Sequence, residues 1–391
     1  MTPGGRRRGR TVAAVVLLAL VLVAAGGTWW LLRGRQPGSG TTAQPVVRDG
    51  ELVDARTGDP WVPRGVTWSS FEYACAQGWG YSALDSLGPD AEAEQAATIA
   101  SWGADTVRLP LNQDCWLGTR GAPVSDDFDS RTPTGYRAAV GDFVDALGAE
   151  GIVVVLDLQS RKRIGSPEFG DLAMPDSESL AFWASVATEY ADDPSVLFDA
   201  FGSPTSRQDA RGRPVLDLTW RCWRDGGCAV PVEDDRTEVD QDGATYDAQG
   251  MADVVATIRR AGAEQPILLS GLEAGNDLER WAELAPPDDQ LVAAFHVDDR
   301  AACGERCWDR VVAPLADRFP VLTTDVHATD PLDGWVADYL RWADAHGIGS
   351  LLGVWAEHPG DPQALVSDLA GRPTAWGELA RAWLRRGTDG L

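Results

Sequence analysis

Positive charge is scarce in most of this chain. Of its 391 residues, the first 35 contain six of the 34 Lys and Arg and none of the 59 Asp and Glu. The remainder therefore has 28 basic against 59 acidic residues, a formal charge of −31. Such a surface repels nucleic acids and other anionic polymers. The composition excludes a nucleic-acid partner and is typical of a highly soluble exported domain.

Two motifs are also missing. No Cys-x-x-Cys pair occurs among the six cysteines, which disfavours a metal site of clustered thiolates. No Gly-x-Gly-x-x-Gly follows the first β-type run, which disfavours a dinucleotide-binding open sheet. An even number of cysteines in an exported domain predicts disulfides. Spacing pairs Cys222 with Cys228 and Cys303 with Cys307, and leaves Cys75 and Cys115 for a third bridge.

The N-terminal segment has the pattern of a membrane anchor. Arg6, Arg7, Arg8 and Arg10 precede 11–32, which has no charged residue and is long enough to cross a bilayer as a helix. A cleaved signal peptide is the alternative, because "VAAGG" offers small residues. The anchor is favoured, since the apolar stretch continues through Trp29 and Trp30. We expect a cytoplasmic and transmembrane segment at 1–35, a flexible linker at 36–45, and an extracellular domain at 46–391.

Beyond a hairpin-like lead-in, apolar β-type runs alternate with amphipathic helical stretches. The runs begin at Val62, Asp105, Ile152, Val196, Pro266, Leu291, Phe319 and Ser350. Strand–helix alternation predicts a parallel sheet, and eight units in this length predict closure. The expected fold class is therefore α/β, a (β/α)8 TIM barrel preceded by a transmembrane helix.

Polar and aromatic residues follow the ends of these runs, where barrels place their sites. In chain order they are Thr67, Trp68, Arg108, Asp157, Gln159, Gly202, Ser203, Gly271, His296, Asp298, Asp325, His327, Trp355 and Glu357. The strand bodies are apolar, so the pattern predicts a pocket at the barrel mouth.

From about Val46 onward the chain resembles glycoside hydrolase family 5, the retaining cellulases and mannanases. The segments that carry the resemblance are "RGVTWSSFE", "WGADTVRLPLNQDCWL", "VVVLDLQ", "MADVVATIRRAGAEQPILLSGLEAGNDLERW", "VAAFHV", "CWDRVVAPLADRFPVLTTD" and "GSLLGVW". The resemblance implies a sugar-binding cleft, with Arg108, His296 and Trp355 at matching positions and no cofactor. Trp68 is expected to line the same cleft.

Five other positions of the family pattern are changed. The family's Asn-Glu-Pro at the end of strand 4 is Gly202-Ser203-Pro204 here, so the acid/base is replaced by Ser203. The nucleophile position holds Asp325 instead of Glu. Gln159 stands for a His and Asp298 for a Tyr. Retaining hydrolysis needs two carboxyl groups about 5–5.5 Å apart, and a serine hydroxyl cannot replace the proton donor.

These changes predict a glycan-binding pseudo-glycosidase, with polysaccharide as partner and a monomeric state. An active glycosidase remains the main alternative, with Asp298, Glu357, Glu168 or Asp171 supplying the displaced acid. A structural envelope protein is the third, and a metal-binding barrel that uses His296, Asp298, Asp325 and His327 is a further alternative. Among the exposed-loop tryptophans, Trp355 is the predicted sugar platform, while Trp79, Trp116, Trp220 and Trp223 serve either stacking or packing.

Overall fold

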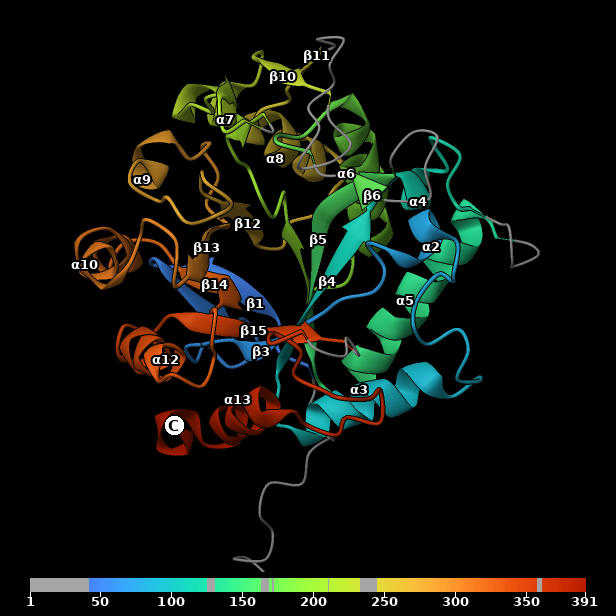
Figure 1. Ribbon diagram of the computed structural model, residues 1–391, viewed down its shortest axis with the longest axis vertical. Helices are drawn as coiled ribbons and strands as arrows, with labels where there is room; N and C mark the ends of the chain where they lie inside the picture. Colours follow the sequence, from blue (N-terminus) through green and yellow to red (C-terminus); the bar gives the residue numbers. More distant parts are fainter. Residues whose placement is uncertain are drawn as a thin grey trace, which may run out of the picture. The chain divides into compact units, whose positions relative to one another are not determined.

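Eight parallel strands close into a barrel in the computed structural model (Figure 1). The strands are β3 (Arg64–Trp68), β4 (Thr106–Asn112), β5 (Val153–Lys162), β7 (Val196–Asp199), β12 (Ile267–Ser270), β13 (Leu291–Asp298), β14 (Val321–His327) and β15 (Gly349–Trp355). Each pairs with the next, and β15 returns to β3. All eight predicted runs are therefore strands of one closed (β/α)8 barrel.

The structure describes residues 42–124, 131–162, 169–170, 172–209, 211–232, 245–356 and 361–391. The predicted anchor and most of the predicted linker lie outside these ranges. Within them, no helix is both long enough and apolar enough to cross a membrane.

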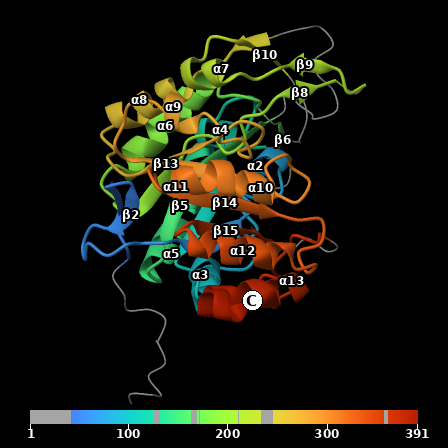
Figure 2. The same ribbon diagram turned by 90° about the vertical axis from the view of Figure 1, so that its left-hand side faces the viewer.

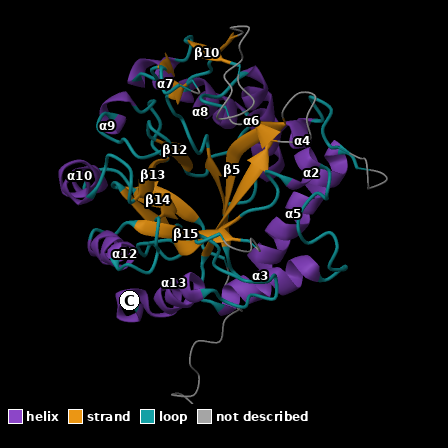
Figure 3. Ribbon diagram, in the orientation of Figure 1, coloured by secondary structure: helices purple, strands orange, loops and turns teal. Residues whose placement is uncertain are grey.

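Helices surround the barrel on its outer side (Figure 3). They are α3 (Ala91–Ser101), α5 (Pro133–Ala149), α6 (Ser177–Tyr190), α8 (Met251–Arg260), α12 (Trp335–Ala345) and α13 (Ala375–Arg386). Local sequence fixes several of their starts, because a side-chain oxygen accepts from a free backbone N–H of the first turn. Thr132 caps α5, Thr374 caps α13, and Asp176 forms a capping box with Ser179 at α6.

Shorter elements decorate the barrel. They are the hairpin β1 (Pro45–Arg48) and β2 (Glu51–Asp54), helices α2 (Ala74–Gln77), α4 (Gln113–Leu117), α7 (Trp220–Asp225), α9 (Trp281–Leu284), α10 (Glu305–Cys307) and α11 (Ala313–Ala316), a π-helical turn (Trp308–Val312), a C-terminal 3-10 turn (Gly387–Gly390), and strands β6 (Phe169–Gly170), β8 (Arg207–Gln208), β9 (Pro214–Leu216), β10 (Ala229–Pro231) and β11 (Thr245–Asp247). Figure 2 shows β8, β9 and β10 beside one another.

Alternate strand residues form two apolar layers. The layer inside the barrel consists of Val153, Val155, Leu197, Leu268, Val292, Ala294, Leu322 and Leu351, joined by Leu52 of β2. The intervening strand residues pack against the helices in a second, larger cluster. Because side chains alternate along a strand, the residues that continue the inner series toward the C-terminal ends point into the barrel mouth.

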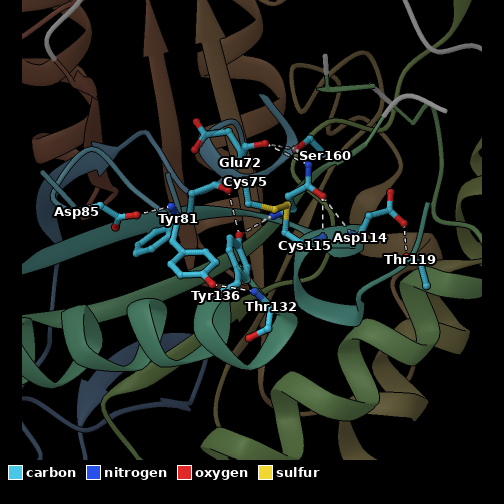
Figure 4. The surroundings of a disulfide bond; sticks show 12 residues. Glu72, Cys75, Tyr81, Asp85, Asp114, Cys115, Thr119, Thr132, Tyr136 and Ser160 are labelled. Carbon is cyan, nitrogen blue, oxygen red and sulfur yellow. Dashed lines mark hydrogen bonds between the residues drawn. A yellow bond between two sulfur atoms is a disulfide. The ribbon is translucent and has the colours of Figure 1, made fainter. Parts of the chain in front are cut away.

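All three predicted disulfides are present. Cys222 bonds to Cys228, Cys303 to Cys307, and Cys75 to Cys115. The last bridge ties α2, in the loop after β3, to α4, in the loop after β4 (Figure 4). It therefore fixes two of the loops that frame the barrel mouth.

Loss of the Cys75–Cys115 bridge is expected to destabilise the fold more than loss of Cys303–Cys307. The first closes a sequence separation of 40 and the second a separation of four. The chain-entropy estimate gives about 4 and about 2 kcal/mol respectively. Thermal unfolding of the two Cys→Ala double variants tests the order. A larger fall in Tm for the variant that lacks Cys303–Cys307 would contradict the expected order.

Candidate functional site

A buried ion cluster forms the floor of the barrel mouth. Asp157 and Asp199 continue the inward series of β5 and β7, and Arg108 of β4 lies between them. Arg108 Nε donates to Asp199 Oδ2 at 3.0 Å, while its Nη2 lies 2.9 Å from Asp157 Oδ2 without hydrogen-bond geometry. Arg108 is 4% exposed and both aspartates are fully buried.

The charged groups of this floor shift one another's pKa values. Burial alone would lower the pKa of Arg108, but the carboxylates of Asp157, Asp199 and Asp325 outweigh it and raise that pKa. Burial also raises the pKa of Asp157 well above its usual range, against the attraction of Arg108. The floor thus holds a permanent guanidinium cation among carboxyl groups, a pattern typical of functional sites.

A bulge in β14 places Asp325 at the mouth. The pairing of β13 with β14 runs from Phe295 with Thr323 directly to His296 with Asp325, so Thr324 is an extra residue. Bulges of this kind redirect side chains and are frequent beside active sites. Asp325 is half-buried, accepts no hydrogen bond within the described ranges, and acts electrostatically on both Arg108 and His296. The predicted nucleophile position therefore does face the cluster.

A second bulge places Gln159. The pairing of β4 with β5 passes from Leu111 with Leu158 to Asn112 with Ser160, which leaves Gln159 unpaired in the ladder. Its side chain is partly exposed, and its amide makes no hydrogen bond to the residues that the structure describes. The sequence predicts Gln159 at the mouth, and the register shows that it is the extra residue of a bulge.

His296 closes another side of the floor. Gly275 approaches it so closely that a Cβ on this glycine would lie 2.7 Å from the imidazole Cγ. Burial lowers the pKa of His296, so the ring is neutral near neutral pH. Its Nε2 is buried without a partner in the described ranges. A buried, unpaired nitrogen is costly, so a water or ligand hydroxyl is its natural complement.

The strand 4 tip carries no acid. Ser203 is partly exposed and makes no hydrogen bond within the described part of the chain. Gly202 is buried, and its backbone N–H donates to the Leu158 carbonyl at 3.4 Å. The adjoining Pro204 carbonyl accepts from Ala274 N at 2.8 Å, which ties this tip to the loop after β12.

Trp355 and Trp68, which the sequence predicts in the cleft, lie on the outer side of the barrel strands. Both rings are buried, 0% and 1% exposed, on the helix-facing side of their strands. Trp355 packs against Trp102 at 4.5 Å between ring centroids, and Trp68 packs against Phe143 of α5 at 4.7 Å. In these positions neither ring faces the mouth, so neither is a sugar platform in this structure.

Of the remaining candidate tryptophans, Trp79 alone within the described ranges has a substantially exposed ring, 42%. Trp116, Trp220 and Trp223 are buried and serve packing. Trp79 lines a pocket of about 380 Å³ beside the ends of β3 and β15, together with Trp68, Ser69, Ser70, Tyr73 and Leu87. A larger groove of about 1040 Å³ lies at the opposite ends of the strands, where Pro45 and Gln290 line it.

Of the alternative acids, Asp298 is the one that lies within the described residues. Asp298 is partly buried and accepts from its neighbour Arg300, whose backbone N–H donates at 2.7 Å. Glu168, Asp171 and Glu357 lie outside the described residues. Asp298 pairs in register with His327, yet no group of three potential metal ligands is present in the ranges that the structure describes.

Sequence reasoning missed Glu72, which lies in the loop after β3. It is 3% exposed, and its carboxylate accepts from Ser70 N at 2.8 Å and from the Ser69 hydroxyl. Burial raises the pKa of Glu72 to about 7, against these hydrogen bonds and the attraction of Arg108. Its backbone carbonyl accepts from Asn112 and Ser160 (Figure 4). Glu72 ends "RGVTWSSFE", one of the segments that carry the family resemblance, but no role was predicted for it, since a glutamate in a loop is usually solvated.

The protein is expected to become less stable as pH rises from about 5 to about 8. Glu72 has a pKa of about 7 in the folded state, against 4.5 for an ordinary glutamate, so the folded state keeps a proton that the unfolded state releases. This costs up to about 3 kcal/mol across the window. Buried Asp105, whose pKa is raised to about 6, acts in the same direction.

Replacing Glu72 with glutamine is expected to raise Tm at about pH 8 and to flatten its pH dependence, because the amide oxygen still accepts from Ser70 N and the amide nitrogen donates to the Ser69 hydroxyl, without the charge. Glu279→Gln, on the surface, is the matched control. Thermal unfolding at several pH values measures both. Equal pH dependence in wild type and Glu72→Gln would refute the role assigned to this carboxyl.

A closed (β/α)8 barrel whose C-terminal strand ends gather arginine, histidine and carboxyl groups is the scaffold of a TIM-barrel enzyme. Residues 65–367 match the cellulase family, glycosyl hydrolase family 5. The chain therefore belongs to glycoside hydrolase family 5. No curated protein matches the sequence.

Solved structures share the fold at low identity. A β-glucanase from Saccharophagus degradans, in complex with cellotetraose, is 16% identical with a TM-score of 0.65, over 89% of this chain and 95% of that one. An endoglucanase from Thermobifida fusca, also with cellotetraose, is 16% identical with a TM-score of 0.58, over 88% and 97%. A mannanase from Streptomyces sp. SirexAA-E is 16% identical with a TM-score of 0.57, over 91% and 94%.

Proposed function

We propose that this protein is a membrane-anchored, extracellular glycan-binding barrel in which glycoside hydrolysis is impaired or lost. The observation that carries the proposal is the contrast between the two parts of the mouth. The floor keeps a buried Arg108–Asp157–Asp199 cluster, whereas the strand 4 tip presents Gly202 and Ser203. Binding groups are retained where the proton donor is absent.

Free polar groups support a binding role. Gln159, Ser203 and Asp325 are partly exposed, and none makes a hydrogen bond within the described ranges. They surround a floor in which His296 Nε2 and both Asp157 oxygens lack hydrogen-bond partners among the described residues. Sugar hydroxyls donate and accept, so a pyranose satisfies several of these atoms at once.

Loss of hydrolysis follows from the chemistry of the two altered positions. A retaining glycosidase needs one carboxyl group to protonate the leaving oxygen and a second to attack. Without a positioned general acid the rate falls by about 10²–10⁴-fold. Asp325 is one methylene shorter than glutamate, and a misplacement of about 1 Å can cost about 10²-fold.

Charge selects the class of glycan. Arg108 is surrounded by Asp157, Asp199 and Asp325, and the whole chain carries a formal charge of −25. Uronates and sulfated glycans are disfavoured by this field, so an uncharged glucan or mannan is the proposed partner. Trp79 adds an exposed ring for stacking, and its Nε1 is fixed by Gln77 at 2.7 Å.

Export to an oxidising compartment is supported by the three disulfides. The anchor is proposed at 11–32, outside the described residues. We propose a monomer with neither metal nor cofactor.

Incubation of the full chain with aryl cellobiosides, β-glucans and mannans, beside a glycan array, tests the proposal. We expect retention of neutral glycans without turnover. Turnover that disappears in Asp325→Ala would establish a working glycosidase instead. Absence of any retained glycan would leave a structural envelope protein.

One observation favours the active-glycosidase alternative. Glu72 lies near Arg108 and has a pKa of about 7, which suits a proton donor at neutral pH. Its carboxyl is almost completely buried and bound by Ser69 and Ser70, which argues against contact with a leaving group. Hydrolysis by the wild type that is lost in Glu72→Gln would support this alternative.

A further inference from the structure

Gly202 lies directly against the floor of the mouth. A Cβ at this position would meet Arg108 Nη2 at 2.5 Å, Gln159 Oε1 at 2.7 Å and Asp157 Oδ1 at 2.9 Å. Real Cβ atoms do not approach other atoms so closely, so the space of a side chain at 202 is already occupied. Because the strand 4 tip has no side chain at this position, Arg108 Nη2 and the side-chain oxygens of Gln159 and Asp157 fill it together.

Of the three occupants, Gln159 differs in being free. Arg108 and Asp157 are buried and in ionic contact with each other. Gln159 is the extra residue of the β5 bulge, is partly exposed, and has an amide without partners in the described part of the chain. A free amide offers an acceptor oxygen and two donor hydrogens within one planar group.

From this geometry we propose that Gln159 is the specificity-determining contact for glycan at the mouth, and that Gly202 is required to make room for its amide. The amide binds two adjacent hydroxyls of an uncharged pyranose, one as donor and one as acceptor. Arg108, Asp157 and the Nε2 of His296 lie beneath as the floor. This inference rests on the proposed glycan-binding function and names the residue that reads the sugar.

Titration of the full chain with cellotetraose and with mannotetraose by calorimetry tests the contact. For the tetrasaccharide that wild type binds, Gln159→Ala is expected to weaken binding by roughly tenfold, the value of two lost hydrogen bonds. Gln208→Ala, on the exposed strand β8, is the matched control and is expected to bind as wild type. Monodeoxy analogues of the same oligosaccharide identify the two hydroxyls: wild type loses affinity for them, and Gln159→Ala shows no further loss.

A second variant tests the shared space. Gly202→Ala introduces the Cβ that collides with the amide, so it is expected to weaken glycan binding as Gln159→Ala does. In the Gln159→Ala background the same change is expected to lower affinity and Tm by less than in wild type, because only the contacts with Arg108 and Asp157 remain.

The outcomes separate the two proposals. If wild type binds a tetrasaccharide and Gln159→Ala binds it equally well, the role of Gln159 is refuted while glycan binding stands. If the effects of Gly202→Ala and Gln159→Ala on Tm and affinity simply add, the shared-space argument is wrong. If wild type binds neither tetrasaccharide nor any array glycan, both the proposed function and this contact fail.

Discussion

Glutamate at positions 203 and 325, with Gly202 left unchanged, is expected to give the barrel measurable aryl-cellobiosidase activity. Ser203→Glu supplies the missing proton donor on a partly exposed strand end, and Asp325→Glu extends the attacking carboxylate. Gly353 lies next to Asp325: a Cβ on this glycine would be 3.2 Å from Asp325 Oδ1. Because Gly353 has no side chain, it leaves space for the longer side chain of Asp325→Glu. We expect a gain of about 10²-fold or more over wild type.

The single variants are the controls for this gain, since Asp325→Glu alone lacks the proton donor and Ser203→Glu alone keeps the shorter carboxylate of Asp325. Adding Gly202→Asn, which completes the family sequence, is expected to reduce the benefit. A side chain at 202 collides with the Arg108 and Asp157 ends as well as with Gln159, and overpacking costs about 1–3 kcal/mol. Equal activity of the double and triple variants would show that the floor rearranges freely.

The barrel itself was predictable from the sequence. Each strand lies in a short, mainly apolar run, and the runs alternate with helical patterns, so element type and order were fixed locally. Disulfide pairing also followed from spacing, because two pairs are separated by six and four residues.

The direction of side chains at the strand ends was not predictable. Trp355 and Trp68 stand among residues that point into the mouth, yet both rings lie on the helix side. A shift of one residue reverses the face, and β15 shifts register between Leu352 and Trp355. The bulges at Gln159 and Thr324 likewise depend on pairing between strands, which a single sequence does not display.

Asp199 is a different case, because a signal was present. It interrupts "VLFDAF", a run otherwise apolar, and a buried carboxylate requires a partner. Arg108, in the equally apolar run of β4, is the basic residue that satisfies it. A search for oppositely charged residues within the apolar runs would have predicted the contact between Arg108 and Asp199 from the sequence.

Replacement of Arg108 by methionine is expected to destabilise the fold by about 3–5 kcal/mol at about pH 7.5, a loss of roughly 10 °C in Tm. Methionine fills the volume of the side chain, but Asp157 and Asp199 are left buried without their cation. The stability of Arg108→Lys is expected to lie between those of wild type and Arg108→Met, because lysine keeps the charge but cannot contact both aspartates with a planar guanidinium. Arg341→Met, which removes an exposed partner of Asp338, is the matched control and should change little.

The pH dependence of Arg108→Met distinguishes lost charge pairing from lost packing. Without the guanidinium the pKa of buried Asp157 rises further, so the folded variant takes up a proton as pH falls and its deficit in the free energy of unfolding relative to wild type narrows toward about pH 5. A deficit caused by packing alone would be the same at every pH. Thermal unfolding of both proteins across this range decides between the two, and a Tm for Arg108→Met equal to wild type at about pH 7.5 would mean that the buried cluster does not hold the floor together.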